Sequence, residues 1–390
     1  MVKINNIKIQ GIGPINDLEL NFEPHFNIIC GQNGIGKTTI LECISQSFSI
    51  INNLKKTSWK EHGNWEISTL IDNVPNNKRF DIKQFHPYEN SSSGVGFYEN
   101  ANDVIFFKTH RNIPYKKLPS LSTDKLKTTN TFASKTVSGS LPDDIKNWFI
   151  NRYLFSAQAG ALDDSQLKNY TLAKECFQIL NSDISFNKVI PNSFEILLNT
   201  PLGEIYFEYL SSGYKSCLAV LLGLIQEVEL RYKNPNKYIR EFEGIVIIDE
   251  LDLHLHPEWQ AKIYEALKMI LPKAQIFTST HSPHIIQIAK PNEIIALIFD
   301  DVKNIKLNPI KNEVYGFQGW TVEEILTDVM GMGETRTETY LTAINSFNVS
   351  IDKEDFDTAQ KYFEIIDKML HPENSLRKIL KIQLIGADND

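Results

Sequence analysis

A glycine-rich run of eight residues carries the strongest chemical signal in the sequence. GQNGIGKT, at 31–38, matches the phosphate-binding pattern G-x-x-x-x-G-K-[ST] at every defined position. It follows the apolar run FNIIC and opens a helical pattern, and backbone N–H groups at such a helix start point toward an anion. We therefore predict that this loop binds a nucleotide, through Gly31, Gln32, Asn33, Gly34, Ile35, Gly36, Lys37, Thr38 and the adjoining Thr39.

A second candidate is the acidic end of the run GIVIIDE, at 244–250. Four apolar residues in a row fit a strand that is buried on both faces of a parallel sheet, and Asp249 then lies at its carboxyl end, where such sheets bind ligands. Two carboxylates at a strand end are often only solvated, but a phosphate loop earlier in the chain favours function. We predict that Thr38 and Asp249 bind Mg²⁺ and that Glu250 is the general base toward water.

Histidines follow both of the later strand-like runs. His281, in TSTHSPH, comes one strand after the predicted base, so we expect it to contact the γ-phosphate of a bound nucleotide. His284 is better explained by packing or capping. His254 and His256 have a spacing that zinc sites use, but no cysteine or third ligand lies nearby in the sequence, which disfavours a metal site there.

LSSGYKS, at 210–216, lies between the phosphate loop and the acidic strand and is by itself only a Ser/Gly helix start. The order of loop, LSSGYKS, DELDLHLHP and THSPH resembles that of the ABC-class ATPases, the superfamily that includes SMC, RecF and OLD-type proteins. LSSGYKS is similar to their signature motif, although Ser212 replaces the usual glycine and Tyr214 the usual glutamine. DELDLHLHP resembles their Walker B and D-loop region, and THSPH their switch-histidine loop.

The resemblance implies a composite ATP site between two copies of the chain. In this superfamily the heads pair head to tail, so Ser211, Ser212 and Gly213 of one copy are expected at the γ-phosphate held by the other. It further implies ATP and Mg²⁺ as cofactors, ATP hydrolysis, and a homodimer or higher homo-oligomer. The Q-loop is not identified, and its candidates are Gln84 and the segment FFKTHRN, which contains His110 and Arg111.

The elements that must position these residues divide the chain into three parts. The resemblance implies an α/β fold, a P-loop NTPase of ABC-ATPase type with a mixed sheet, an inserted and largely helical lobe, and a C-terminal helical appendage. Residues 1–50 and 205–318 are expected to form the two halves of the ATPase head. Residues 51–204 read as an insertion, loop-rich and then helical, because they are rich in Asn, Ser, Thr and Lys before helical spacing returns. Residues 319–390 are predicted to be a helical region for partner binding or dimerisation.

Composition excludes several classes of protein. The net charge of −8 over 390 residues excludes a generally basic, DNA-coating protein, although local lysine clusters leave a nucleic acid among the candidate partners. The longest apolar run, 217–225, is about half of a membrane span, and the N-terminus lacks the apolar core of a signal peptide. The four cysteines show no disulfide or metal spacing, as is typical of a reducing compartment. We therefore predict a cytoplasmic protein without a membrane partner.

The tail after Trp320 resembles the C-terminal region of ATPase subunits in Septu-type and retron-associated anti-phage systems. The resemblance implies a regulatory ATPase that controls a separate HNH-type nuclease. A nuclease within this chain is not expected, because one D-x-D, at 355–357, lies in a helical pattern and the other is the chain end. The alternatives are a RecF- or SMC-like ATPase that clamps DNA, and a transporter ATPase subunit. A helical appendage that only completes the dimer is the simpler interpretation of the tail.

Overall fold

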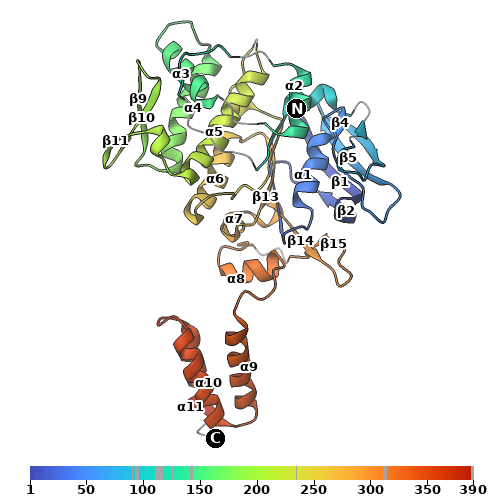
Figure 1. The fold of residues 1–390 in the computed structure, drawn as a ribbon, viewed down its shortest axis with the longest axis vertical. Coiled ribbons are helices and arrows are strands. Elements are labelled where there is room, and N and C mark those ends of the chain that lie inside the picture. Colours follow the sequence, from blue (N-terminus) through green and yellow to red (C-terminus); the bar gives the residue numbers. More distant parts are fainter. Residues whose placement is uncertain are drawn as a thin grey trace. The chain divides into compact units, whose positions relative to one another are not determined.

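The computed structural model divides into two compact units, Met1–Gly331 and Met332–Asp390, which we describe separately (Figure 1). It describes residues 1–89, 91–92, 96–109, 117–124, 127–140, 144–233, 235–310 and 314–387. No helix in this described part of the chain is both long enough and apolar enough to cross a membrane.

A six-stranded mixed sheet runs through the first unit. Its order is β15(Ile305–Leu307), β14(Ile294–Phe299), β3(Phe26–Gly31), β13(Gln275–Thr280), β12(Ile245–Ile248) and β8(Val104–Phe107). All neighbouring pairs are parallel except β14 with β15. The carboxyl ends of β3, β13, β12 and β8 therefore share one edge. The predicted α/β class with a mixed sheet is confirmed.

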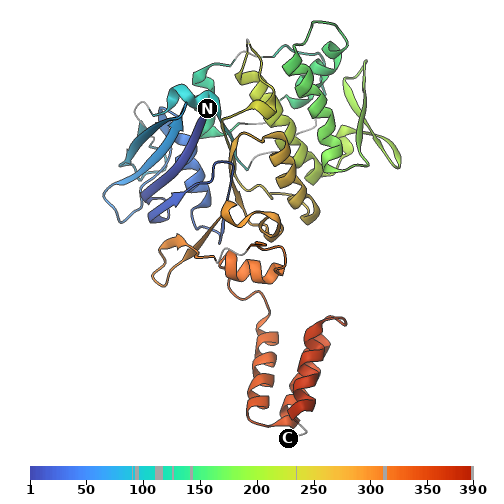
Figure 2. The same ribbon diagram turned by 180° about the vertical axis from the view of Figure 1, so that it is seen from behind.

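Every residue of β3, β13, β12 and β8 is buried, and successive residues alternate between two cores. Ile28 and Val246 pack into a core shared with the helices, whereas Ile29 and Ile247 pack into a core shared with an antiparallel sheet. The helical layer contains α3(Ile145–Ser156), α4(Asp164–Leu180), α5(Ser212–Arg231), α6(Pro257–Ile270) and α7(Pro283–Ile288). Figures 1 and 2 show these helices on one side of the sheet and the antiparallel strands, in blue, on the other.

The antiparallel sheet shows where the predicted insertion was wrong. Its order is β2(Ile15–Asn21), β1(Val2–Ile12), β5(Gly63–Ile71) and β6(Val74–Ile82). The last two strands fall in the stretch expected to be loop-rich, yet they extend the N-terminal sheet. Trp65 and Ile67 alternate with polar residues along β5, a period of two that the polar composition obscured. Asp72 and Asn73 both have positive φ, as a tight hairpin turn requires.

The rest of the range 51–204 contains helices, short strands and loops. Besides α3 and α4 it contains α2(Thr129–Ser138) and two short strands, β4(Ile51–Asn52) and β7(Ser91–Ser92). A small three-stranded sheet follows, with the order β11(Gly203–Tyr206), β10(Glu195–Thr200) and β9(Ser185–Ile190). Phe149 of α3 and Phe177 of α4 pack in the same core as α5, so this layer shares the core of the nucleotide-binding half.

The boundary of the C-terminal region lies later than predicted. We expected it at 319, but Ile325, Val329 and Met330 are buried in the core of the first unit, and the contact-based division falls after Gly331. These residues follow α8(Val322–Glu324), whose capping box Thr321 provides. The second unit consists of α9(Glu338–Asp352), α10(Phe356–Met369) and α11(Ser375–Ala387). Its own small core includes Tyr340, Phe347, Ala359, Ile366, Leu380 and Leu384.

Candidate nucleotide-binding site

The phosphate loop joins β3 to α1(Lys37–Gln46), and two of its glycines are required by the backbone. Gly31 has φ +142°, and a Cβ there would lie 2.5 Å from the carbonyl oxygen of Leu297. Gly36 caps the helix with φ +88°, and its Cβ would approach Cγ1 of Ile15 to 3.0 Å. A side chain at either position would strain the loop, because L-residues rarely adopt these angles. The N-terminus of α1 consequently opens at the end of a buried strand, as the sequence predicts.

Lys37 is buried in the loop, and its ammonium group is bound by backbone oxygens. Nζ donates to the carbonyl oxygens of Gly31 and Gln32, each at 2.9 Å. Burial lowers the pKa of Lys37, although Asp249, Glu250 and Asp252 act in the opposite direction. Among the residues that the structure describes, no carboxylate oxygen lies within 4.0 Å of Nζ. The positive charge is therefore held at the loop by dipoles and not by an ion pair.

Thr38 and Asp249, the two predicted magnesium ligands, lie in contact. The Thr38 hydroxyl donates to the two carboxylate oxygens of Asp249 at 3.0 and 3.2 Å. Asp249 is almost completely buried just after β12, and its N–H donates to the carbonyl oxygen of Phe107 at the end of β8. A hydroxyl beside one carboxylate is the kind of partial oxygen shell that Mg²⁺ uses together with water and phosphate oxygens. The donor set fits the expected ion.

Ser279 of β13 links the metal-binding carboxylate to the predicted base, and the sequence analysis missed it. Its hydroxyl donates to Asp249 Oδ1 at 2.6 Å and accepts the N–H of Glu250 at 2.7 Å. Its carbonyl oxygen accepts the N–H of Leu251 at 2.9 Å. Glu250 itself has φ +51°, an unusual value for a non-glycine residue. One buried hydroxyl thus orients Asp249 and secures the backbone turn that carries Glu250. The signal that could have indicated it is TST, on the strand beside β12.

His281 lies at the same edge, in the turn after β13. Its N–H donates to Asp252 Oδ1 at 3.0 Å, and the Thr280 hydroxyl donates to the same oxygen at 2.6 Å. Burial and the nearby charge of Lys37 lower the pKa of the His281 imidazole, outweighing Asp252 and the other carboxylates. The ring is therefore neutral at pH 7, which leaves it one N–H to donate and one nitrogen to accept.

The signature-like segment begins α5, where Ser211 is the N-cap residue. The Ser211 side chain accepts the N–H of Tyr214 at 3.3 Å, and Ser211 and Ser212 are both exposed. Gly213 packs against the loop after Glu250, since a Cβ there would lie 3.2 Å from the carbonyl oxygen of His254. In the described residues no hydrogen bond joins 211–213 to the phosphate loop of the same chain.

Tyr214 departs from the family pattern for a structural reason. Its ring is buried and meets Trp259 of α6 edge to face, with centroids 5.0 Å apart. Its hydroxyl donates to the carbonyl oxygen of Phe177 at the end of α4. The residue therefore anchors the signature-like helix start to the inserted helical layer, a contact that the usual glutamine is too small to make.

The other histidine and Q-loop candidates that the structure describes make their hydrogen bonds away from the phosphate loop and Asp249. His256 is the N-cap residue of α6, and its Nδ1 accepts the N–H of Glu258 at 3.4 Å. No group of three potential metal ligands of the His, Cys, Asp or Glu type is present in the described ranges. Gln84 follows β6 of the antiparallel sheet, where its carbonyl oxygen accepts the N–H of Lys56. His110 and Arg111 lie outside the described residues, although the strand before them, β8, ends at the site edge.

Comparisons with known proteins show which family the chain resembles. A family model described as "AAA domain, putative AbiEii toxin, Type IV TA system" matches residues 26–287. The chain is 44% identical to the Septu protein PtuA of Bacillus thuringiensis over 98% of both chains. It is 32% identical over 109 residues to the retron Vc95 probable ATPase of Vibrio cholerae, covering 28% of this chain and 21% of that one.

Among solved structures, the SMC head domain from Thermotoga maritima aligns with a TM-score of 0.48 and 14% identity, covering 79% of this chain and 99% of that chain. The family match spans the phosphate loop, the acidic strand and the switch histidine, and the identity to the Bacillus relative extends along nearly the whole of both chains. The chain therefore belongs to the AAA-domain proteins of the Septu PtuA family.

Proposed function

We propose that this protein is an ATP-binding and ATP-hydrolysing regulatory ATPase of an anti-phage defence complex. The observation that carries the proposal is the convergence of Thr38, Asp249, Ser279 and Glu250 beside a complete phosphate loop. The names of the Septu and retron relatives support the defence setting. Residues 31–39 would cradle the phosphates of ATP through backbone N–H groups, and the Lys37 ammonium would exchange its carbonyl partners for the β- and γ-phosphates.

Hydrolysis is assigned to Glu250 and His281. Mg²⁺ held by Thr38 and Asp249 would neutralise charge that develops on the phosphates. Glu250, on the turn fixed by Ser279, would orient the attacking water and accept its proton. The neutral His281 would donate a hydrogen bond to the γ-phosphate, on a loop that Asp252 holds in place.

We propose that the site is completed by a second copy of the chain. Ser211 and Ser212 are exposed at the N-terminus of the 20-residue helix α5, and an exposed helix start attracts an anion. In a head-to-tail dimer these residues and the Gly213 amide would meet the γ-phosphate held by the partner copy. Such an interface forms only while the γ-phosphate is present, so hydrolysis would act as a switch.

Glu250→Gln tests the composite site, because it retains the geometry but removes the base. We expect the variant to bind ATP, to lack turnover and to accumulate as an ATP-dependent dimer in size-exclusion chromatography with light scattering. Lys37→Ala is the matched control and should stay monomeric with or without ATP. A Glu250→Gln chain that remains monomeric at saturating ATP would contradict the proposed dimer.

The output is proposed to be a separate HNH-type nuclease. The D-x-D at 355–357 supports this indirectly, because Asp355 caps α10 through the Thr358 N–H and does not lie at a strand end. The second unit, Met332–Asp390, is the proposed region for partner binding or dimerisation. Co-purification of the tagged full chain with an HNH nuclease encoded beside it, with and without ATP, tests this. Recovery of no nuclease in either condition would contradict the proposed regulatory role but would not bear on the proposed ATP hydrolysis.

A further inference from the structure

Two loops of the antiparallel sheet form a surface on which lysines are interleaved with exposed aromatic rings. One loop is 53–62, between β4 and β5, and the other is 83–89, after β6. We call it the basic–aromatic surface and define it by Lys55, Lys56, Trp59, Lys60, His62, Lys83, Phe85, His86 and Tyr88. None of these residues belongs to the nucleotide-binding site described above.

Backbone and side-chain contacts hold the two loops together as one surface. The N–H of Lys56 donates to the carbonyl oxygen of Gln84 at 3.0 Å, and Lys56 Nζ lies 5.3 Å from the centroid of the Phe85 ring. The rings of His86 and Tyr88 lie 5.6 Å apart. Lys56 of the first loop therefore lies beside Gln84 and Phe85 of the second loop.

The aromatic rings on this surface face water. Trp59 is 66% exposed, Phe85 55% and Tyr88 91%. Three large rings left in water within two short loops are unfavourable for the free protein, because each has a large apolar area that folding has not buried. Exposed rings of this kind are flat platforms on which other flat groups can stack.

The charge of the surface differs in sign from that of the whole chain. The two loops contain four lysines and only two acidic residues, Glu61 and Glu89, in a protein with net charge −8. In the described part of the chain no carboxylate oxygen lies within 4.0 Å of any of the four lysine ammonium groups. Lys56 and Lys60 donate to the backbone oxygens of Lys60 and Asn16, which do not cancel their positive charge.

We propose that the basic–aromatic surface binds single-stranded nucleic acid. Lysine ammonium groups would pair with the phosphates, and Trp59, Phe85 and Tyr88 would stack on unpaired bases. A duplex satisfies the first interaction only, because its base faces are already stacked on one another. The proposal goes beyond the proposed ATPase function, since it assigns a ligand to a surface outside the ATP site.

The surface lies next to the phosphate loop. The N–H of Gly13 donates to the carbonyl oxygen of Lys55, and the N–H of Thr57 donates to that of Gly11, each at 2.9 Å. The turn that contains Gly13 packs against the loop, since Ile15 is the residue that a Cβ at Gly36 would meet. A strand bound to the surface would therefore lie on the nucleotide-binding unit itself.

Fluorescence anisotropy of the full chain without ATP tests the proposal directly. The probes are a labelled 20-nucleotide dT strand, the matching rU strand and a mixed-sequence duplex of the same length. With four phosphate contacts, affinity for the single strands should fall about 50-fold between 50 and 200 mM salt. The duplex should bind at least about tenfold more weakly, because it offers no stacking. The dT and rU arms show whether DNA or RNA is preferred.

Two variants and a matched control distinguish binding at this surface from binding that depends only on the net charge of the protein. The first variant reverses the charge of all four lysines of the surface and should weaken binding at least about 30-fold. Its substitutions are Lys55→Glu, Lys56→Glu, Lys60→Glu and Lys83→Glu. The control reverses four lysines elsewhere, Lys168, Lys188, Lys262 and Lys273, changes the net charge equally and should leave binding within about threefold of wild type. Trp59→Ala with Phe85→Ala and Tyr88→Ala removes only exposed rings, so the chain should fold and bind at least about tenfold more weakly.

Tight duplex binding, equal losses in the control, or wild-type affinity in the aromatic variant would overturn the proposal. A chain that binds neither single strand would overturn it as well. ATP binding is measured separately, so failure here is distinguishable from failure of the proposed ATPase function.

Discussion

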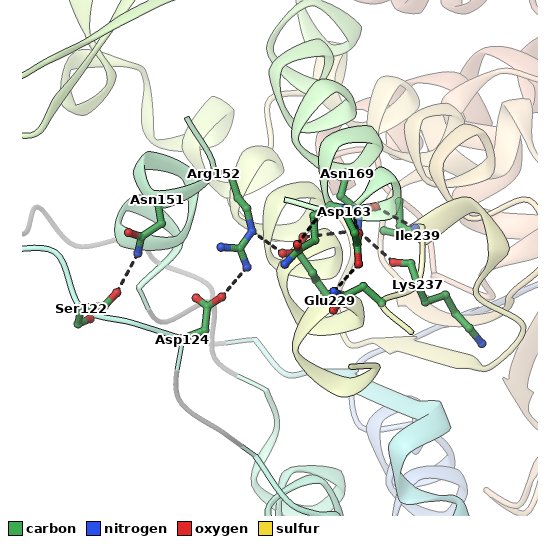
Figure 3. A network of polar contacts seen from close by, with 11 residues as sticks. Ser122, Asp124, Asn151, Arg152, Asp163, Asn169, Glu229, Lys237 and Ile239 are labelled. Carbon is green, nitrogen blue, oxygen red and sulfur yellow. Dashed lines mark hydrogen bonds and ion pairs between the residues drawn. The ribbon is translucent and has the colours of Figure 1, made fainter. Parts of the chain in front are cut away.

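Two regions of the first unit contain buried charged side chains, and these charges have different partners. In one region the partners are side chains of opposite charge, and in the other they are carbonyl and hydroxyl groups. Glu229 of α5 lies in a network of ion pairs and hydrogen bonds within the helical layer (Figure 3). Arg152 of α3 pairs with Glu229 and with Asp124, and Asn169 of α4 donates to Glu229 at 3.5 Å. At the phosphate-loop edge, by contrast, Lys37 is bound by carbonyl oxygens and Asp249 by the hydroxyls of Thr38 and Ser279.

A second part of the α5 network surrounds Glu227. Arg231, one turn later, pairs with this carboxylate, and so do Lys135 at 2.7 Å and Lys127 at 3.1 Å. Burial would raise the pKa of Glu227, but these three cations together lower it to about 2. Burial lowers the pKa of Lys135 to about 8, which keeps it mainly protonated at pH 7. The negative charge of Glu227 is therefore compensated by cations of the protein itself.

The difference indicates which charges serve the fold and which serve a ligand. A buried charge with an opposite charge beside it is compensated, and removing its partner costs stability. A buried charge held only by dipoles remains available to a ligand of opposite charge, and removing it costs function more than stability. The following predictions test this contrast.

The largest effect is expected at the phosphate loop. Lys37→Ala should lower ATP turnover by about 10²–10³-fold, because it removes a preorganised positive charge from the phosphates. The melting temperature should change little, since among the described residues no carboxylate forms an ion pair with Lys37 and its ammonium is held by backbone carbonyl oxygens. Phosphate release and thermal unfolding are measured on the same preparation. Turnover within tenfold of wild type would contradict the assignment.

Arg152→Ala should have the opposite profile. It leaves Glu229 and Asp124 without their cation, and we expect a loss of about 3–5 kcal/mol in the free energy of unfolding with ATP affinity unchanged in the folded fraction. Arg79→Ala is the control, because its pairs with Glu66 and Asp81 are exposed and screened by water, so its loss of stability should be far smaller. Urea denaturation measures the free energy of unfolding of both variants. Equal losses in the two would contradict the distinction between the buried network and exposed ion pairs.

Acid should weaken the sealed network through Glu227. Because its folded pKa is lowered to about 2, its contribution is complete above its ordinary value near 4.5 and is lost as pH falls from there toward 2. The loss should reach about 3 kcal/mol. Glu227→Gln should be less stable at pH 7 and should show a shallower decline over this interval in urea titrations. A parallel decline in both proteins would show that other carboxyls dominate.

Ser279→Ala should give the smallest effect, about a tenfold lower kcat, because one hydrogen bond to a charged group is lost. The dissociation constant for ATP should stay within about threefold, while half-maximal activity should require more Mg²⁺. Ser279→Thr keeps a hydroxyl and should restore most of the rate. A loss of melting temperature without a shift in the Mg²⁺ requirement would show that Ser279 has only a structural role.

Local patterns in the sequence predicted several elements closely. The four apolar residues of GIVIIDE form the strand β12, Ile245–Ile248, as expected, and α5 begins at Ser212, inside the segment LSSGYKS that reads as a helix start. Buried parallel strands are continuous apolar runs, and helix starts have capping residues, so both are visible locally. The β5–β6 hairpin was missed because β6, VPNNKRFDI, has four consecutive polar residues, at 76–79, in its middle. Only its pairing with β5 shows that it is a strand.

The candidate site shows the same division between local and distant information. GQNGIGKT specifies a phosphate loop because its glycines permit backbone angles that other residues avoid and because its lysine and threonine have defined chemistry. The residues around Ser279, TST, show that hydroxyls lie on this strand, but they do not show that the Ser279 hydroxyl joins Asp249 to Glu250, 30 and 29 residues earlier. That contact requires β12 and β13 to be parallel neighbours, a property of the sheet as a whole.

What the sequence by itself determined is therefore the phosphate loop, the acidic strand end and the position of His281 after the next strand, since each depends on residues close together in the chain. Only the tertiary structure decided which charges are compensated. Glu227 and Glu250 are both glutamates near a run of apolar residues. One is enclosed by Arg231, one turn later on α5, and by two lysines that folding brings from α2 and the segment before it, and the other is placed on a strained turn at the open edge of the sheet. That choice depends on packing between distant segments, which no local pattern encodes.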